Sequence, residues 1–240
     1  MAKITKVDIS GKIGNLVFYP VNGKTRVRTQ ADDVKLTEAT KRSAKDFGKV
    51  VKVSKYLRQG LAQVIPKSAK KWPEYLVNDA VSKSLPALLA APGVSQDNPP
   101  GLVGLEFNEK SGMYHRLKAP LLVDWSQPGQ VILNIPAMNP VRQIQAIART
   151  QQVHWKIAVG GSLVGEPMIT GGYATTLDLD YVDALLPARS IALPFTVQPG
   201  SLNAVVLSMQ YSVLKKGILR LTTDQRWLPS GIIAAWYQGT

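Results

Sequence analysis

Three aspartates in the stretch TTLDLDYVD come closest to a metal-binding cluster in this sequence. Because side chains alternate along a strand, Asp178 and Asp180 are predicted to share one face. Together with Asp183 they offer the carboxylates that a hard cation such as Ca²⁺ prefers. A half-buried strand with one solvated face shows the same alternation without any ligand. We therefore interpret the pair as a polar face and predict no metal site.

Serine and histidine chemistry is equally incomplete. In VGGSLVGE, Ser162 follows Gly160 as in a nucleophile elbow, but Val164 occupies the place of the second glycine. The segment also lacks the Gly-Lys-Ser/Thr of a phosphate loop, so the glycine pair is interpreted as a hairpin turn. The two histidines, His115 and His154, have no shared spacing that would make a metal pair. We predict no catalytic residue, no metal and no cofactor, and hence a protein that is not an enzyme.

Arginines and a tyrosine near the N-terminus form the first positive signal. The pair Asn22-Gly23 lies between two β-prone runs, NLVFYP and TRVRT, and predicts a type I′ hairpin. That turn would pair Tyr19 with Arg26 and Val17 with Arg28, so these side chains share one face. Guanidinium groups bind phosphates or carboxylates in a fork, and Tyr19 can stack on a base or on Arg26.

Lysines form the second signal, on a helix predicted over residues 38–64 with Thr37 as its N-cap. Its apolar side would hold Phe47, Val50, Ser54, Leu57, Leu61 and Val64. The opposite side would carry the lysine row, which comprises Lys41, Lys45, Lys49, Lys52 and Lys55. Few acids interrupt this row, so salt bridges between neighbouring turns cannot neutralise it. We predict that these lysines, with Tyr19, Arg26 and Arg28, bind nucleic acid or an acidic partner.

The charge of the whole chain points the same way. Its formal net charge is +13, and residues 1–72 hold 17 Lys/Arg against 5 Asp/Glu. Residues 73–240 hold only 12 against 11. Such a concentrated field favours a polyanion or an acidic neighbouring subunit, although a solubilising extension has the same composition. No zinc finger, helix-turn-helix or RNA-recognition motif accompanies it, and a membrane partner is not expected.

The expected cellular location is inferred from the residue types and targeting segments that the sequence lacks. The chain has no cysteine, so disulfides and thiolate nucleophiles are excluded. The start, MAKITKVDIS, shows no secretory signal, and no apolar run approaches the roughly 18 residues that span a bilayer. We expect the protein in the cytoplasm, or in a virion or other assembly that is released without a signal peptide.

The periodicity divides the chain into two parts. We predict a basic hairpin-plus-helix module over residues 1–92, a Pro/Gly linker over 93–101 and a β-sandwich domain over 102–240. After Leu102 the sequence alternates in short strands separated by Pro/Gly turns, as in antiparallel sandwiches. Trp155 lies in the third strand of a seven-strand count, where immunoglobulin-type cores commonly keep a tryptophan. The expected fold class is α+β, with an immunoglobulin-like or fibronectin-like sandwich.

The opening GKIGNLVFYPVNGKTRVRTQ, with the basic helix after it, resembles a family of uncharacterised bacterial proteins. Its members share a Gly-Lys-x-Gly-x-x-Val start, a Gly-Lys turn and a strand ending in arginine. The matching positions here are Gly11, Lys12, Gly14, Val17, Gly23, Lys24 and Arg28. Similar openings occur in phage-like structural proteins. The resemblance covers about 60 residues and implies a basic module joined to a sandwich, with no catalytic residue and no assigned function.

These observations lead to one functional hypothesis and one alternative. The first is a non-enzymatic structural or assembly protein, such as a phage-type virion component. Its sandwich would make protein contacts with further copies or another subunit, and its basic module would contact an acidic partner or nucleic acid. The alternative is a cytoplasmic nucleic-acid-binding accessory protein that acts as a monomer or small oligomer.

Overall fold

A computed structural model describes residues 3–5, 8–30, 36–64 and 74–240 of the chain. The chain forms two compact units, the N-terminal unit (Met1–Ala44) and the C-terminal unit (Lys45–Thr240). Both contain antiparallel sheets, and a long helix begins in the first and continues in the second. The fold class is therefore α+β, as expected.

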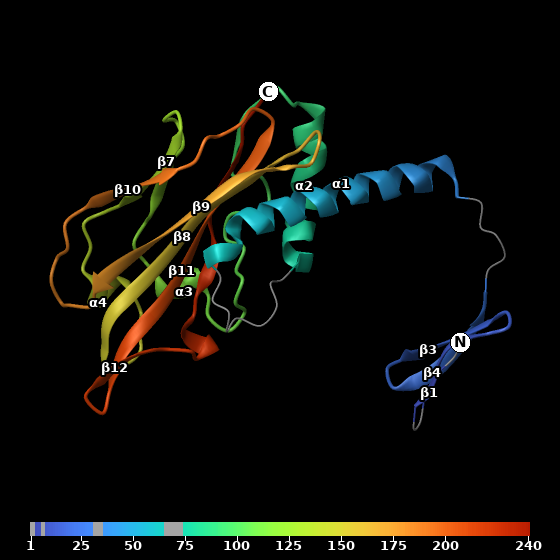
Figure 1. Ribbon diagram of the computed structural model, residues 1–240, viewed down its shortest axis with the longest axis horizontal. Helices are drawn as coiled ribbons and strands as arrows, with labels where there is room; N and C mark the ends of the chain where they lie inside the picture. Colours follow the sequence, from blue (N-terminus) through green and yellow to red (C-terminus); the bar gives the residue numbers. More distant parts are fainter. Residues whose placement is uncertain (1–2, 6–7, 31–35, 65–73) are drawn as a thin grey trace. The chain divides into compact units, whose positions relative to one another are not determined.

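The N-terminal unit contains a four-stranded antiparallel sheet in the order β1-β2-β3-β4 (blue in Figure 1). Its strands are β1 (Lys3–Thr5), β2 (Asp8–Ile13), β3 (Leu16–Val21) and β4 (Lys24–Thr29). Asn22 and Gly23 both have positive φ, 50° and 70°, as a type I′ turn requires. Tyr19 pairs with Arg26 and Val17 with Arg28, so the predicted hairpin register is confirmed.

Two sheets form the body of the C-terminal unit. The larger has the order β5-β13-β11-β8-β9, with β12 also paired to β11, and the smaller has the order β10-β7-β6. The larger sheet contains β5 (Gln96–Asp97), β8 (Thr150–Leu163), β9 (Ile169–Asp180), β11 (Ser201–Lys215), β12 (Ile218–Leu221) and β13 (Ser230–Tyr237). The smaller contains β6 (Leu122–Asp124), β7 (Gln130–Ile135) and β10 (Arg189–Pro194). Every strand pair in both sheets is antiparallel.

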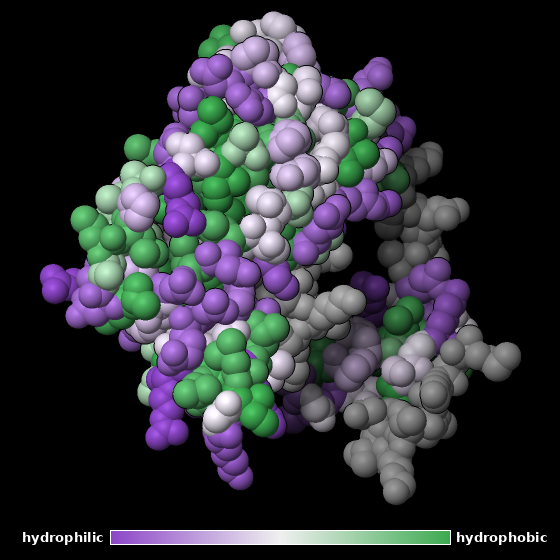
Figure 2. Space-filling model, turned by 60° about the vertical axis from the view of Figure 1, so that its left-hand side comes forward, coloured by the Kyte–Doolittle hydropathy of each residue, from purple (hydrophilic) through white to green (hydrophobic). Residues whose placement is uncertain are grey.

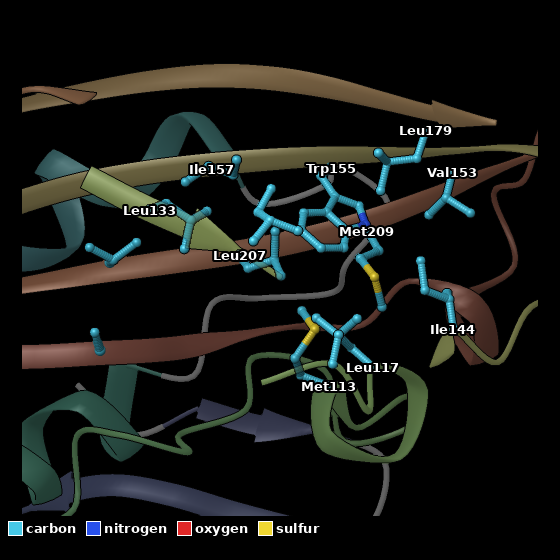
Figure 3. Close-up of a cluster of buried hydrophobic side chains, with 14 of the residues drawn as sticks. Met113, Leu117, Leu133, Ile144, Val153, Trp155, Ile157, Leu179, Leu207 and Met209 are labelled. Atoms are coloured by element: carbon cyan, nitrogen blue, oxygen red, sulfur yellow. The ribbon is translucent and has the colours of Figure 1, made fainter. Parts of the chain in front are cut away.

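One hydrophobic core lies where the two sheets face each other. Odd-numbered residues of β8 and β11 point into it, as the two-residue period of a strand requires. Figure 3 shows Trp155, Leu207 and Met209 grouped with Leu133 of the smaller sheet. Trp155 is fully buried. A sandwich of two antiparallel layers is therefore a plausible description of this unit.

A second core covers the opposite face of the larger sheet. It joins Ala158 and Val206 of the sheet to side chains of two helices, α1 (Glu38–Leu61) and α2 (Glu74–Ala90). A short 3₁₀ helix, η1 (Ala62–Val64), extends α1. Because both faces are covered, β11 is buried almost continuously from Ser201 to Val213.

Three glycines let α1 approach the sheet backbone closely. A Cβ atom added to Gly160 of β8 would lie 2.8 Å from the carbonyl carbon of Gly60 in α1. One added to Gly172 of β9 would lie 2.6 Å from the Gly60 carbonyl oxygen. The expectation of a turn at Gly160 and Gly161 was therefore wrong. Both lie inside β8, and the missing side chain of Gly160 makes room for the helix.

The structure divides the chain at a different place from the expected 93–101 linker. Residues Gln96 and Asp97 pair with β13, and the N–H of Asn98 donates to the carbonyl of Ala235. The helices before this segment bury their apolar sides on the sheet, which joins α2, η1 and the buried part of α1 to the body. Phe47 also departs from its predicted place, since it is 63% exposed and the buried side of α1 begins one turn later, at Val50.

Three short helical turns complete the C-terminal unit: α3 (Met113–Arg116), α4 (Pro140–Gln143) and the 3₁₀ helix η2 (Gln225–Trp227). Among the helices of the described ranges, none is long and apolar enough to cross a membrane.

Candidate functional site

The predicted arginine face is present on the sheet of the N-terminal unit. All six residues of β4 are exposed, and Arg26 and Arg28 point to the same side as Tyr19. The Arg28 guanidinium carbon lies 5.9 Å from the centroid of the Tyr19 ring, within cation–π range. The ring therefore stacks with Arg28, its diagonal neighbour, instead of with the expected Arg26. Neither arginine has an acidic partner within residues 3–5, 8–30, 36–64 and 74–240.

The other face of this small sheet is apolar and largely uncovered. Ile13 and Val27 are each 53% exposed, and Leu16 is 37% exposed. None of residues 9–30 is buried. A sheet normally needs a second layer on its apolar face to be stable, and the described part of this unit supplies none.

The lysine row lies on the exposed side of α1. Lys45, Lys52 and Lys55 are exposed and Lys49 is half-buried, whereas Val53 and Leu57 on the other side are fully buried. Helix geometry thus separates the two sides as predicted.

Most of the row is not neutralised. Lys41 pairs with Glu38 at 2.8 Å, and the Lys55 ammonium lies 5.9 Å from the Tyr56 ring centroid. Lys45, Lys49 and Lys52 have no acidic partner in the part of the chain that the structure describes. The central three lysines are therefore available to an external anion.

A hydrogen-bonded chain that sequence reasoning missed crosses three strands of the larger sheet. His154 of β8 places Nδ1 2.7 Å from Asp178 Oδ1 on β9 and Nε2 2.7 Å from Ser212 Oγ on β11. The order of groups is that of a serine hydrolase triad. No sequence motif announces it, because the three residues meet only through the pairing of β8 with both neighbours.

The surroundings of Ser212 do not suit nucleophilic catalysis. Acyl transfer needs free N–H donors beside the nucleophile to stabilise the oxyanion. Ser212 lies inside β11, which is paired to β8 on one side and to β12 on the other, so the neighbouring N–H groups are used in the sheet. Ser212 is also only 4% exposed. We interpret this hydrogen-bonded chain as a polar link between three strands.

Ser162, considered above as a nucleophile, is also fully buried, and its hydroxyl donates to the Leu163 carbonyl at 3.0 Å.

The three aspartates of the considered cation cluster have separate partners. Asp178 binds His154, Asp180 accepts from Gln152 Nε2 at 3.1 Å, and Asp183 accepts from Asn139 Nδ2 at 2.7 Å. Across the described residues there is no group of three or more His, Cys, Asp or Glu that could hold a metal ion. His115 is exposed on α3, as its basic surroundings suggested.

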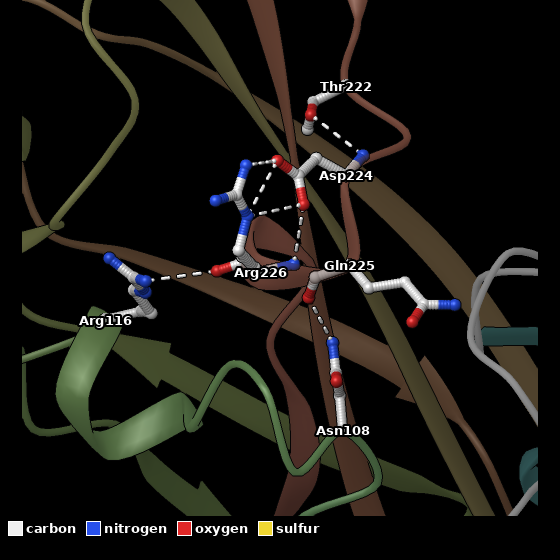
Figure 4. Close-up of polar contacts among 6 residues, drawn as sticks. All are labelled: Asn108, Arg116, Thr222, Asp224, Gln225 and Arg226. Carbon is white, nitrogen blue, oxygen red and sulfur yellow. Dashed lines mark hydrogen bonds and ion pairs between the residues drawn. The ribbon is translucent and has the colours of Figure 1, made fainter.

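A polar cluster surrounds η2 (Figure 4). Arg226 Nη2 donates to Asp224 at 2.7 Å, and these hydrogen bonds lower the pKa of the Asp224 carboxyl to about 2. The Arg116 guanidinium lies 3.9 Å from the Trp227 ring centroid and donates to the Arg226 carbonyl at 3.1 Å. Asn108 Nδ2 donates to the carbonyls of Gln225 and Leu228. These contacts hold η2 in place.

An open cavity of about 510 Å³ lies beside this cluster. Lys215, Arg220 and Trp227 are among its lining residues. No sequence motif predicts this cavity, because it depends on how the β11–β12 hairpin lies against η2. Arg226, a third cation of the lining, is paired with Asp224, whereas Lys215 and Arg220 have no acidic partner among the described residues and make the cavity a secondary place for an anion. Its width and exposure favour no particular ligand.

Large apolar side chains also reach the surface of the C-terminal unit, and Figure 2 shows such patches between hydrophilic residues on one face. At the β11–β12 hairpin, Ile218 and Leu221 are each 55% exposed and Leu219 is 47% exposed. Leu122 and Leu185 are 68% and 73% exposed. Exposed apolar groups of this size commonly mark protein contacts.

Comparisons with known proteins add nothing to this geometry: no family model, no curated protein and no solved structure matches the chain.

Proposed function

We propose that this chain is a non-enzymatic structural or assembly protein, of the kind found as a phage-type virion component. Its C-terminal unit makes protein contacts, and its basic N-terminal part binds a polyanionic partner, with nucleic acid as the first candidate. The resemblance of the opening residues to phage-like structural proteins motivates the virion setting. A particle of this kind would form in the cytoplasm and be released without a signal peptide.

The observation that carries the proposal is the row of unneutralised lysines. Lys45, Lys49 and Lys52 lie one turn apart and face away from the buried side of α1. Like charges at this spacing destabilise a helix, and interspersed glutamates would remove the repulsion. A partner that supplies negative charge explains why the row is retained.

The sandwich supports the assembly part of the proposal. Two antiparallel layers enclose Trp155, which is consistent with the immunoglobulin-like or fibronectin-like type that we propose for this unit. Such sandwiches commonly serve as contact modules, and the exposed leucines at their ends suit that role. The hydrogen-bonded chain of Ser212, His154 and Asp178 lacks oxyanion donors, so it does not favour a hydrolase.

One observation favours the alternative, a nucleic-acid-binding accessory protein. Tyr19 and Arg28 together present a ring and a guanidinium on an exposed sheet face. Aromatic and cationic groups on such a face bind single-stranded nucleic acid by base stacking and backbone contact.

The test compares two triple variants for binding to a single-stranded oligonucleotide at several salt concentrations. Lys45→Gln/Lys49→Gln/Lys52→Gln should reduce the slope of log K against log salt by about 2, since each neutralised phosphate contributes about 0.7. The matched control, Lys110→Gln/Lys118→Gln/Lys216→Gln, removes equal charge from exposed positions elsewhere and should leave the slope nearly unchanged. Equal slopes for wild type and both variants would overturn the role of the lysine row.

Light scattering on natively purified protein, with the ratio of absorbance at 260 and 280 nm, separates the two functions. A large homogeneous particle supports the assembly protein, and co-purifying nucleic acid places the basic part on that cargo. A monomer or dimer that carries nucleic acid removable by salt supports the accessory protein.

A further inference from the structure

The free edges of the described sheets differ in how well they are protected against pairing with another strand. Native proteins shorten such edges or place lysine, arginine or proline on them. The protected edges are β5 with two residues, β1 and β6 with three each, β12 with four including Arg220, β4 with Lys24, Arg26 and Arg28, and β10 with Arg189 and Pro194. The exception is β9, which has twelve residues and no lysine, arginine or proline.

The hydrogen-bonding groups that β9 directs outward follow from its register with β8. The Tyr181 N–H donates to the Gln151 carbonyl at 2.8 Å, which makes these two a hydrogen-bonded pair. Such pairs recur at every second residue of an antiparallel ladder. Odd-numbered residues of β9 therefore bond to β8, while Gly172, Ala174 and Thr176 direct their N–H and C=O groups away from it. Within the described ranges these groups have no backbone partner.

We propose that the β9 edge, Gly172–Asp180, pairs antiparallel with the same edge of a second copy of this chain. The pairing joins two larger sheets into one continuous sheet across a two-fold axis. This inference rests on the proposed assembly function and names the surface by which the copies associate.

Three properties of the edge suit a second copy. The register with β8 is regular from Gly171 to Asp180, since the one irregularity lies between Gly161 and Ser162, so most of β9 is an uninterrupted template. Residues 172–177 carry no charge. An antiparallel pairing centred on Thr176 brings Asp178 and Asp180 opposite earlier, neutral residues of the partner strand, so no like charges face each other.

The charge distribution allows two copies of the chain to approach each other at β9. Residues 73–240, which contain every strand of the two sheets of the C-terminal unit, hold 12 Lys/Arg against 11 Asp/Glu and are nearly neutral, while the excess charge lies in residues 1–72. Two copies that meet at β9 therefore bring together weakly charged surfaces. The β4 edge, with three cations in six residues, would bring like charges face to face.

The decisive variant is Thr176→Pro in the full chain. Thr176 is exposed and its N–H points away from β8, so proline removes an outward donor without breaking the β8–β9 ladder. Thr176→Val keeps the N–H and is the matched control. Thr176→Lys adds a charge that would face its symmetry mate, and it keeps the test valid if proline perturbs folding.

Sedimentation equilibrium across the micromolar range measures the self-association of the four proteins. Wild type and Thr176→Val should associate with similar affinity, and Thr176→Pro and Thr176→Lys should weaken association about tenfold or more. A wild-type chain that stays monomeric, or edge variants that associate as wild type does, would overturn the inference.

The binding of the oligonucleotide by the same proteins, at concentrations where they are monomeric, separates this inference from the proposed function. Binding that is retained in Thr176→Pro, together with lost association, supports the β9 edge and leaves the lysine row intact. Assemblies that form equally in all four proteins contradict the β9 edge while leaving the assembly function in place.

Discussion

The sheet of the N-terminal unit and the larger sheet of the C-terminal unit are both antiparallel, but their side chains lie in opposite environments. In β4 every residue is exposed, whereas β11 is buried on both faces along most of its length. Arg26 and Arg28 of the first sheet have no acidic partner among the described residues, and the second sheet lies in a part of the chain that is nearly neutral.

This difference shows where the stability of the chain resides. Burial of apolar area is the main favourable term in folding, and the N-terminal sheet has little of it. Its register is fixed by turn chemistry at Asn22 and Gly23 instead of by a core. A sheet of this kind suits a surface that gains its second layer from a partner.

The largest expected effect comes from shortening one side chain in each sheet and comparing the two losses of stability. Trp155→Ala should lower the free energy of unfolding by about 3–5 kcal/mol, because it empties a fully buried site. Val27→Ala, at a 53% exposed position, should change it by less than about 0.5 kcal/mol. Denaturant titration followed by tryptophan fluorescence reports on the C-terminal unit, since residues 1–44 contain no tryptophan.

Trp155→Phe provides a milder variant if the alanine protein does not fold. It should lower the free energy of unfolding by less than Trp155→Ala does, and it should retain a cooperative transition. A large loss from Val27→Ala would mean that the N-terminal sheet contributes a core to global stability, which would contradict the comparison.

A smaller effect is expected at the contact between α1 and the sheet. Gly160→Ala should lower the free energy of unfolding by about 1–3 kcal/mol, because the new methyl group would meet rigid backbone of Gly60. Gly48 lies in α1, as Gly60 does, but a Cβ atom added there would have nothing within 4 Å. Gly48→Ala should therefore raise the free energy of unfolding by about 0.5–1 kcal/mol. Equal effects of the two alanines in a denaturant titration would show that the close approach does not limit packing.

The predictable part of the fold was the part set by local chemistry. The Asn22-Gly23 turn fixes its own register, and the separation of lysines from apolar residues on α1 follows from helical periodicity. Most strands after Leu102 were expected from their alternation, but residues 102–107, also expected as a strand, form turns, and the first strand of this region is β6.

What stayed hidden depends on pairing between distant segments. His154 meets Ser212 from 58 positions away, and only the strand order brings them together. Gly160 and Gly161 look like a turn in sequence because glycine serves both for turns and for close backbone approach. The helices before residue 93 join the sandwich because they cover its second face, a tertiary effect that composition does not encode.

The smallest effect concerns charge, where the two regions also differ. Asp224 is paired with Arg226, whereas Lys45, Lys49 and Lys52 have no acid beside them among the described residues. The folded pKa of Asp224 is about 2, below the value of about 3.9 for an unfolded chain. The ionised carboxylate therefore favours the folded state above pH 4, and this contribution disappears as the pH falls from about 4 to 2. Because the pair is exposed, solvent screens it and the effect is small.

The measurement is the Tm of wild type and Asp224→Asn from pH 7 to pH 2 at low salt. Wild type should have a slightly higher Tm at neutral pH, and the difference should close as the carboxylate is protonated. Glu166→Gln is the control, because that carboxyl has no hydrogen-bond or ion-pair partner among the described residues. A difference for Asp224→Asn that persists unchanged at pH 2 would assign the role of this side chain to the shape of η2 instead of to its charge. The charge pairing of Asp224 would then no longer distinguish the C-terminal sheets from the lysine row.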